Sequence, residues 1–271
     1  FRDGTCCDRW RASLVGILLP DMDGAAGRPE SRSHGVRWEA FLCPMCYNTT
    51  LDRDVRTLEQ RMHKRMLEEG RRVGDPDPPE LPLDRTTAFA RPLWPVVSSR
   101  SPDRISVQRW GLLPRYIRTD EEAREFLKRT PTFNAISEEV AAKRTFKRAF
   151  EAGQRCLVPV TAFQEWRHEG KEKIPYRITM KDGDVFCLGG LWEEHTDGDT
   201  YTVLTTRANP LMEFVHNTRK RMPVIIAEEH WGTWLLPGLP ASEVLGMCAP
   251  YPEELMLAEP VGQRPVQASL F

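Results

Sequence analysis

Three features that would assign this chain of 271 residues to a special class of protein are missing. The apolar run Leu14–Leu19 is far shorter than the roughly 20 residues a membrane-spanning helix needs, and Pro20 follows it. A secretory signal is not indicated, because Asp3 and Asp8 lie where its basic front end would be. The formal net charge is −1, which excludes a strongly basic, DNA-coating protein. A nucleic-acid partner would have to be held by a local basic patch.

The seven cysteines do not form a disulfide framework, because their number is odd and their spacing irregular. Without a secretory signal, this pattern indicates reduced thiols in a cytoplasmic protein. Cys43-Pro44-Met45-Cys46 is a single C-x-x-C motif. A structural zinc site needs four ligands and no second pair has suitable spacing, so we expect no metal and no organic cofactor.

The first 44 residues differ from the rest of the sequence. They contain no lysine, carry six arginines against six acidic residues, and show no sustained hydrophobic period. One interpretation is a disordered leader. The other is that translation starts at Met45, so that residues 1–44 are a non-native leader upstream of the true start.

Helical patterns are few in the remainder, which suits 22 prolines in 271 residues, about 8% where ~5% is usual. Apolar residues at steps of three and four predict a helix over 52–69, with Gly70 as its stop. The sequence also predicts helices over 120–129, 138–152, 228–236 and 241–248. Residues 71–104, with seven prolines, predict a long loop with short strands such as 95–97.

Strand patterns dominate the second half of the chain. Segments rich in β-branched and aromatic residues predict strands at 105–113, 156–160, 162–166, 176–180, 185–192, 201–206 and 224–227. Lys181–Asp184 contains a glycine and predicts a hairpin turn. The expected fold class is α+β, a curved, mainly antiparallel sheet or open barrel with peripheral helices.

Four residues could carry chemistry, and each has an ordinary alternative. Glu165 lies in an apolar strand on the same face as Phe163, so it is either paired, shifted in pKa, or simply an exposed strand residue. His216 precedes three cations and a buried strand, where it could act as an acid near neutral pH or lie in a surface loop. Asn134 precedes a predicted helix and could make local hydrogen bonds there. Cys46, taken alone, could be an ordinary buried thiol.

Basic and aromatic residues are interleaved over 109–118, and a second basic cluster lies at 219–221. Cations that track phosphates and rings that stack on bases are typical of proteins that bind single-stranded nucleic acid, although a charge run is often only a solvated face. The candidate DNA-binding residues are Arg109, Trp110, Arg115, Tyr116, Arg219 and Arg221.

Seven fragments, in this order, resemble the SRAP family (SOS response-associated peptidase), whose vertebrate member senses abasic sites. They span residues 45 to about 236 and are Met45–Asn48, Arg109–Pro114, Phe133–Glu138, Arg155–Pro159, Phe163–Trp166, Gly190–Trp192 and His216–Pro223. The resemblance implies an SRAP-like fold and a single domain over 45–271. Two departures are Ile136, where the family often has arginine, and Tyr116, where it often has tryptophan.

The resemblance implies that Cys46 becomes the N-terminal residue and forms a catalytic set with Asn134, Glu165 and His216. It also implies that the protein senses abasic sites in single-stranded DNA, crosslinks to them covalently, and has autoproteolytic activity. A 1,2-aminothiol suits that reaction, because its amine forms an imine with the ring-opened sugar and its thiol then closes a thiazolidine. The closing step is intramolecular, with an effective molarity on the order of 10⁵ M or more for well-oriented groups. β-Elimination from the imine would give a lyase side activity.

With residues 1–44 attached, the nitrogen of Cys46 is an amide and cannot form the imine. Either an aminopeptidase removes Met45 or the protein cleaves itself before Cys46. Two rival functions remain: a cysteine peptidase acting on other proteins through Cys46 or Cys156 with His216 as base, and a non-catalytic single-strand-binding module. We expect a monomer whose partner is single-stranded DNA with abasic sites. We expect no membrane association, and a location at the nucleoid when the protein is bound to damaged DNA.

Overall fold

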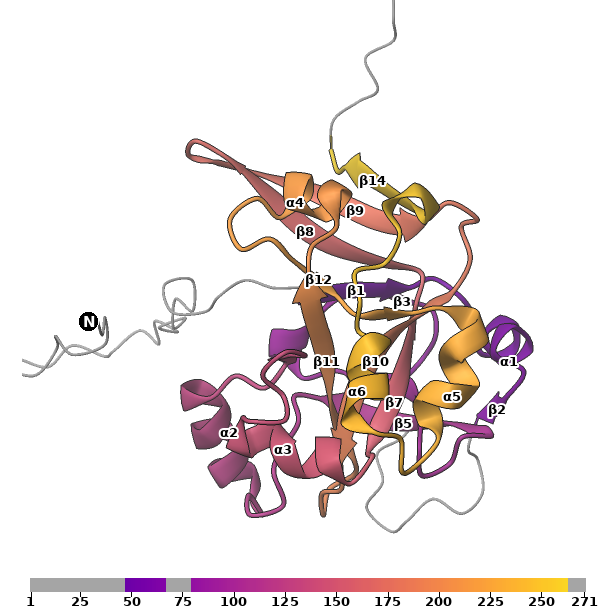
Figure 1. The fold of residues 1–271 in the computed structure, drawn as a ribbon, viewed down its shortest axis with the longest axis vertical. Coiled ribbons are helices and arrows are strands. Elements are labelled where there is room, and N and C mark those ends of the chain that lie inside the picture. Colours follow the sequence, from indigo (N-terminus) through magenta and orange to yellow (C-terminus); the bar gives the residue numbers. More distant parts are fainter. Residues whose placement is uncertain (1–46, 67–78, 263–271) are drawn as a thin grey trace, which may run out of the picture. The chain divides into compact units, whose positions relative to one another are not determined.

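Two sheets contain the strands of the computed structural model, which describes residues 47–66 and 79–262 (Figure 1). All described residues belong to the unit Leu42–Phe271. The predicted leader and Cys46 lie outside the described residues, so the predicted domain limits stay a prediction.

The smaller sheet is antiparallel throughout. Its order is β14 (Met256–Pro260), β9 (Glu172–Met180), β8 (Ala162–Glu169), β1 (Asn48–Leu51) and β3 (Leu83–Thr87). β8 and β9 form a hairpin in which Glu169 pairs with Glu172, and Gly170 in the loop has φ +59°.

The hairpin predicted at Lys181–Asp184 is wrong. β9 pairs with β8 and β14, whereas the strand that follows this turn belongs to the other sheet. Gly170 and Gly183 both have positive φ, so both turns have the chemistry of a tight reversal. Only the pairing of the strands decides which turn closes a hairpin.

The larger sheet closes on itself. Its order is β12 (Arg221–Pro223), β11 (Thr200–Arg207), β10 (Phe186–Glu193), β7 (Arg155–Val160), β4 (Leu93–Ser98), β5 (Arg104–Trp110) and β2 (Arg65–Met66). β13 (Ile225–Ile226) pairs with β10, and β6 (Asn134–Ile136) pairs with β11. Parallel pairing of β5 with β11, at Thr200↔Arg109 and Tyr201↔Trp110, returns the path β11-β10-β7-β4-β5 to its start. The predicted α+β class is confirmed, and the barrel is closed by these pairs.

Thr161 forms the corner between the two sheets, because β7 ends before it and β8 begins after it. Its amide donates to the carbonyl of Thr50 at 2.8 Å, and its hydroxyl accepts from the amide of Asp52 at 3.1 Å. Thr161 is 4% exposed. These contacts satisfy the backbone at the bend and attach β1 to it.

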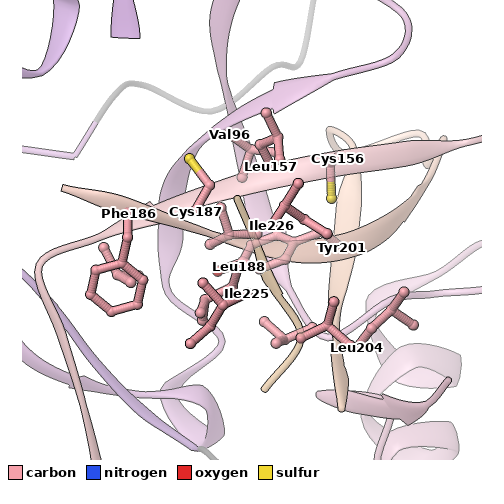
Figure 2. Packing of buried hydrophobic residues seen from close by; sticks show 14 of the residues in the cluster. Val96, Cys156, Leu157, Phe186, Cys187, Leu188, Tyr201, Leu204, Ile225 and Ile226 are labelled. Carbon is pink, nitrogen blue, oxygen red and sulfur yellow. The ribbon is translucent and has the colours of Figure 1, made fainter. Parts of the chain in front are cut away.

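The core lies around β7 and β10, in which every residue is buried. Figure 2 shows side chains of β4, β7, β10, β11 and β13 packed together, among them Leu157, Leu188 and Tyr201. Gly190 lets β10 approach its neighbours closely. A Cβ there would lie 2.5 Å from the carbonyl oxygen of Thr202 and 2.8 Å from Sγ of Cys156.

Helices lie on the outside of the strands. They are α1 (Val55–Met62), α2 (Asp120–Arg129), α3 (Arg144–Glu151), α4 (Pro210–Val215), α5 (Trp231–Leu235) and α6 (Ala241–Gly246), with 3₁₀ turns η2 (Ala88–Ala90), η3 (Glu228–His230) and η4 (Glu253–Leu255). α5 packs on β7, since the indole of Trp234 donates to the carbonyl of Cys156 at 2.9 Å. Within the parts described, no helix is both long and apolar enough to cross a membrane.

Three predicted helices differ from the structure. Of the predicted 228–236, residues 228–230 form the 3₁₀ turn η3 and only 231–235 are α-helical. α1 ends at Met62 because His63 adopts φ +52°, and residues 67–69 of the prediction lie outside the described part. α3 begins only at Arg144, since the preceding residues form turns. The chain before those turns is taken into the sheet, where the amide of Ser137 donates to the carbonyl of Thr205 at 2.9 Å.

Candidate active site

Glu165 is buried, and the alternative of an exposed strand residue is wrong. It lies in β8, is 2% exposed, and pairs across the hairpin with Tyr176 of β9. Phe163, two residues earlier and on the same face of the strand, is fully buried. A carboxylate in such surroundings needs polar partners, because burial of a charge costs free energy of folding. A purely structural role does not explain a glutamate at this position.

Asn134 lies in a strand, so the alternative of a residue at the start of a helix is wrong. β6 runs parallel to β11, with Asn134 opposite Val203. The preceding carbonyl, that of Phe133, accepts hydrogen bonds from the amide of Val203 at 3.1 Å and from the indole of Trp110 at 2.8 Å. The half-buried Asn134 side chain is therefore carried on a backbone that is fixed from two sides.

His216 is also buried, at 2% exposure, so it is not a surface-loop histidine. It ends α4, whose first turn is capped by Asn209 accepting from the amide of Met212 at 2.8 Å. Nδ1 of His216 lies 3.1 Å from the carbonyl oxygen of Arg221 and 3.4 Å from its amide nitrogen. The shorter contact favours a proton on Nδ1, which leaves Nε2 to accept a proton and, as imidazolium, to donate one.

Arg221 connects His216 to the strand that carries Asn134. Its guanidinium donates two hydrogen bonds to Glu138, both 2.7 Å long, and one to the carbonyl of Thr205, also 2.7 Å. The hydroxyl of Thr205 donates to the carbonyl of Ala135 at 3.4 Å. Burial of Glu138 opposes its ionisation, but the hydrogen bonds and charge of Arg221, together with hydrogen bonds from its own amide and from Ser137, lower the pKa of Glu138. β6, β11 and the segment after His216 are thus held as one unit.

A second set of contacts connects His216 to the strand that carries Glu165. Asn217 accepts from the amide of His168 at 3.1 Å and donates to its carbonyl at 2.8 Å. Phe214, two residues before His216, meets the ring of Tyr176 edge-on at 6.1 Å. Tyr176 is the cross-strand partner of Glu165. α4 therefore packs against β8 and β9 close to the buried carboxylate.

The chain that directly follows Cys46 contacts the strand of Glu165 and the residue that precedes Asn134. Asn48 of β1 pairs with Gln164 of β8. The ring of Tyr47 lies 6.0 Å from that of Phe133 in an edge-on contact. Cys46 itself is outside the described residues. Its two successors nevertheless contact the immediate neighbours of both Asn134 and Glu165.

Cys156, the other cysteine considered as a nucleophile, is unsuited to that role. Its thiol is fully buried in the core, and burial raises its pKa well above the usual value. The reactive form of cysteine is the thiolate, which this environment disfavours.

The predicted DNA-binding residues near the site differ in accessibility. Trp110 is fully buried and stacks on Tyr201 at 5.9 Å, so its ring offers no surface to a base and serves to hold Phe133. The half-buried Arg109 donates to the carbonyl of Arg91 at 3.2 Å. Arg221 is engaged by Glu138, whereas Arg219 is exposed.

Arg115 and Tyr116 lie away from this group, between β5 and α2. Arg115 forms ion pairs with Glu193 at 3.2 Å and Glu194 at 2.7 Å. Tyr116 is 54% exposed, with the guanidinium of Arg144 5.8 Å from its ring centre. The structure thus brings Asn134, Glu165, His216 and Arg221 into one connected arrangement and leaves Arg115 and Tyr116 outside it.

Sequence reasoning missed Phe89 and Asn217. Asn217 bridges α4 and β8, and Phe89 is a half-exposed ring in contact with Tyr47. The only signal for Phe89 was a large aromatic residue between two alanines in a loop segment. No group of three or more potential metal ligands occurs in the ranges that the structure describes.

Residues 45–267 match the family model described as SOS response associated peptidase (SRAP). The chain belongs to the SRAP family. The SRAP match covers every described residue of the site. The curated relatives include the abasic site processing protein YoqW of Bacillus subtilis (strain 168), 32% identical over 148 residues, which are 52% of this chain and 62% of that protein. Another is the abasic site processing protein HMCES of Gallus gallus, 28% identical over 168 residues, 52% of this chain and 48% of that protein. The chain thus spans less than two thirds of the curated relatives it matches.

Solved structures share this fold. A protein from Bacteroides thetaiotaomicron is 30% identical, with a TM-score of 0.69 over 79% of this chain and 91% of that one. A protein from Bordetella bronchiseptica is 25% identical, with a TM-score of 0.63 over 80% of this chain and 100% of that one.

Proposed function

We propose that this protein processes abasic sites in DNA and captures them covalently in single-stranded DNA through Cys46. The observation that carries the proposal is that Tyr47 and Asn48 contact the immediate neighbours of Asn134 and Glu165, while Arg221 and Asn217 connect the segment of His216 to both of their strands. A cysteine that precedes Tyr47 is one residue from this arrangement. The names of the relatives YoqW and HMCES, both abasic site processing proteins, support the same substrate.

The reaction begins with a Cys46 that has become the N-terminal residue. Its α-amine, with a pKa of about 7.7–8.0, is partly neutral at cellular pH, unlike a lysine near 10.4. The amine nitrogen adds to C1 of the ring-opened sugar, and loss of water gives an imine. The thiol sulfur then adds to the imine carbon while the nitrogen takes up a proton, which closes a five-membered thiazolidine.

The other residues move protons and orient the reactants. His216, with Nδ1 held by the Arg221 carbonyl, donates from Nε2 to the sugar oxygen as the ring opens. Glu165 transfers protons as water leaves and in the reverse reaction. Asn134 hydrogen-bonds the sugar or the amine and fixes its orientation. Acid–base assistance of this kind is typically worth 10²- to 10⁴-fold in rate.

The free amine requires removal of everything before Cys46, either by an aminopeptidase acting after a start at Met45 or by self-cleavage. In self-cleavage the Cys46 thiol attacks the carbonyl carbon of residue 45, and collapse of the adduct breaks the amide bond, which frees the amine and leaves a thioester. Hydrolysis of that thioester then frees the thiol and releases the chain that ends at residue 45. Lyase activity follows from the same imine, which acidifies the neighbouring carbon and promotes β-elimination.

The decisive experiment mixes protein that starts at Cys46 with a single-stranded oligonucleotide carrying one abasic site, followed by a denaturing gel. We expect a retained band for the wild type and none for Cys46→Ala or for an N-terminally acetylated protein. Glu165→Gln and His216→Ala should slow capture by about 10²-fold or more. The matched control Cys248→Ala, a buried thiol outside the site, should capture at the wild-type rate. Capture by the acetylated protein would refute the mechanism.

The alternative, a cysteine peptidase acting on other proteins, draws on the description of the family. It needs the Cys46 thiol but no free amine. A protein substrate cleaved equally well by acetylated and unmodified protein would favour that function.

A further inference from the structure

Phe89 is an exposed aromatic side chain next to the candidate active site, with no role in the proposed reaction. It lies in η2 and is 44% exposed. Its ring centre lies 4.7 Å from that of Tyr47 and 5.4 Å from that of Phe133. Phe133 and Tyr47 in turn contact each other, so three rings form one cluster beside Asn134.

The turn that presents Phe89 is held firmly. The amide of Ala88 donates to the carbonyl of Tyr47 at 2.7 Å, and Ala88 is fully buried. The amide of Arg91 returns to the carbonyl of Ala88 at 2.9 Å, with φ +48° at Arg91. Arg109, a predicted DNA contact, holds the carbonyl of Arg91. A ring carried by a turn that is fixed in this way loses little conformational freedom when it binds a ligand.

Phe133, the support behind Phe89, is itself fixed. Trp110 donates to its carbonyl at 2.8 Å. A Cβ at Gly111, where φ is +105°, would lie 3.1 Å from its ring. The cluster therefore has a buried side formed by Phe133, which is 5% exposed, and a solvent side formed by Phe89.

We propose that Phe89 is a positioning residue that stacks on the base next to the abasic sugar. The inference rests on the proposed function and names how the same site would recognise its substrate. A nucleotide beside an abasic site has lost one stacking neighbour, and an aromatic ring can replace it. Such stacking does not depend on base identity, because every base has a π-face, so Phe89 would hold damaged strands of any sequence.

The test uses a probe that cannot react. A single-stranded oligonucleotide carries a tetrahydrofuran analogue of the abasic site, which has no aldehyde, with fluorescent 2-aminopurine on its 5′ side in one version and its 3′ side in another. Binding to protein that starts at Cys46 is followed by anisotropy, and stacking by quenching of the 2-aminopurine. We expect quenching by the wild type on one side of the analogue.

Three variants separate ring stacking from folding and from apolar contact. Phe89→Ala should bind about 5- to 150-fold more weakly, the range expected for one base–aromatic stack. Phe89→Leu keeps most of the apolar volume against Tyr47 and Phe133 but should lose the quenching, whereas Phe89→Trp should retain it. Leu236→Ala, at a leucine 53% exposed beyond α5, is the matched control and should behave as wild type.

Binding of Phe89→Ala and Phe89→Leu within twofold of wild type, with quenching unchanged, would overturn the inference, as would failure of the wild type to bind the analogue. Because the probe forms no imine, this result is independent of the capture reaction. A wild type that stacks through Phe89 but never crosslinks leaves the inference standing and removes the proposed covalent step. If the wild type crosslinks but Phe89→Leu still quenches the 2-aminopurine, the proposed covalent step stands and the inference about Phe89 is refuted.

Discussion

Replacement of Gly190 by alanine should destabilise the barrel and disturb the site together. Gly190 lies in the middle of β10, paired on one side with Cys156 of β7 and on the other with Val203 of β11. The added Cβ would lie 2.5 Å from a backbone carbonyl oxygen of β11 and 2.8 Å from Sγ of Cys156. Neither atom is the free end of a flexible side chain, so the strands themselves would have to separate.

Overpacking of this kind costs about 1–3 kcal/mol, and a domain of this size loses about 2–4 °C of Tm per kcal/mol. We therefore expect Gly190→Ala to lower Tm by roughly 2–12 °C in a thermal unfolding experiment. The matched control is Gly232→Ala in α5, where a Cβ has no atom within 4 Å. Alanine there restricts the unfolded chain and should stabilise the protein by about 0.4–1 kcal/mol.

Both variants restrict the unfolded chain in the same way, so the difference between their free energies of unfolding removes this shared contribution. What remains is the free-energy cost of crowding at β10. The same separation of strands would move Val203, which pairs with Asn134, so Gly190→Ala should also slow capture of an abasic oligonucleotide at a temperature where it is folded. A Tm within 1 °C of that of Gly232→Ala would refute the reasoning about close packing.

Three further predictions follow from local contacts. Thr119→Ala removes the capping box of α2, in which Thr119 and Glu122 exchange hydrogen bonds, and should cost about 1 kcal/mol in denaturant unfolding, while Thr119→Ser should cost little. The lowered pKa of Glu138 means that its pair with Arg221 stabilises the fold above about pH 4.5 and is lost as the pH falls below its folded pKa, so Glu138→Gln should flatten the loss of stability between pH 6 and pH 3 in chemical denaturation. An equally steep loss in the variant would contradict that assignment. Cys156→Ala should capture abasic DNA within twofold of wild type on a denaturing gel, because its thiol is buried and protonated; a loss of capture in a folded variant would restore Cys156 as a nucleophile.

The sequence alone predicted much of the strand content, because strands such as β7, β10 and β11 are rich in β-branched and aromatic residues. It also predicted the α2 helix at its observed limits, since the helical period of its apolar residues is a local signal. The sequence also determined family membership, because the short fragments that carry the resemblance occur in the same order along the chain. The burial of Glu165 and His216 was open at that level, since a strand glutamate and a loop histidine look the same whether exposed or enclosed.

Tertiary structure decided what depends on partners distant in sequence. The turns at Gly170 and Gly183 have similar chemistry, and only the order of strands in the two sheets makes the first a hairpin and the second a crossing between sheets. Asn134 lies in a strand because β6 pairs with β11, and no local propensity specifies a pairing between segments so far apart in sequence. The connection of His216 to both Asn134 and Glu165 depends on Arg221 and Asn217 meeting residues 16 and 49 positions away in sequence. Contacts of that range are set by packing, which is why the sequence could name the members of the site but not how they are held together.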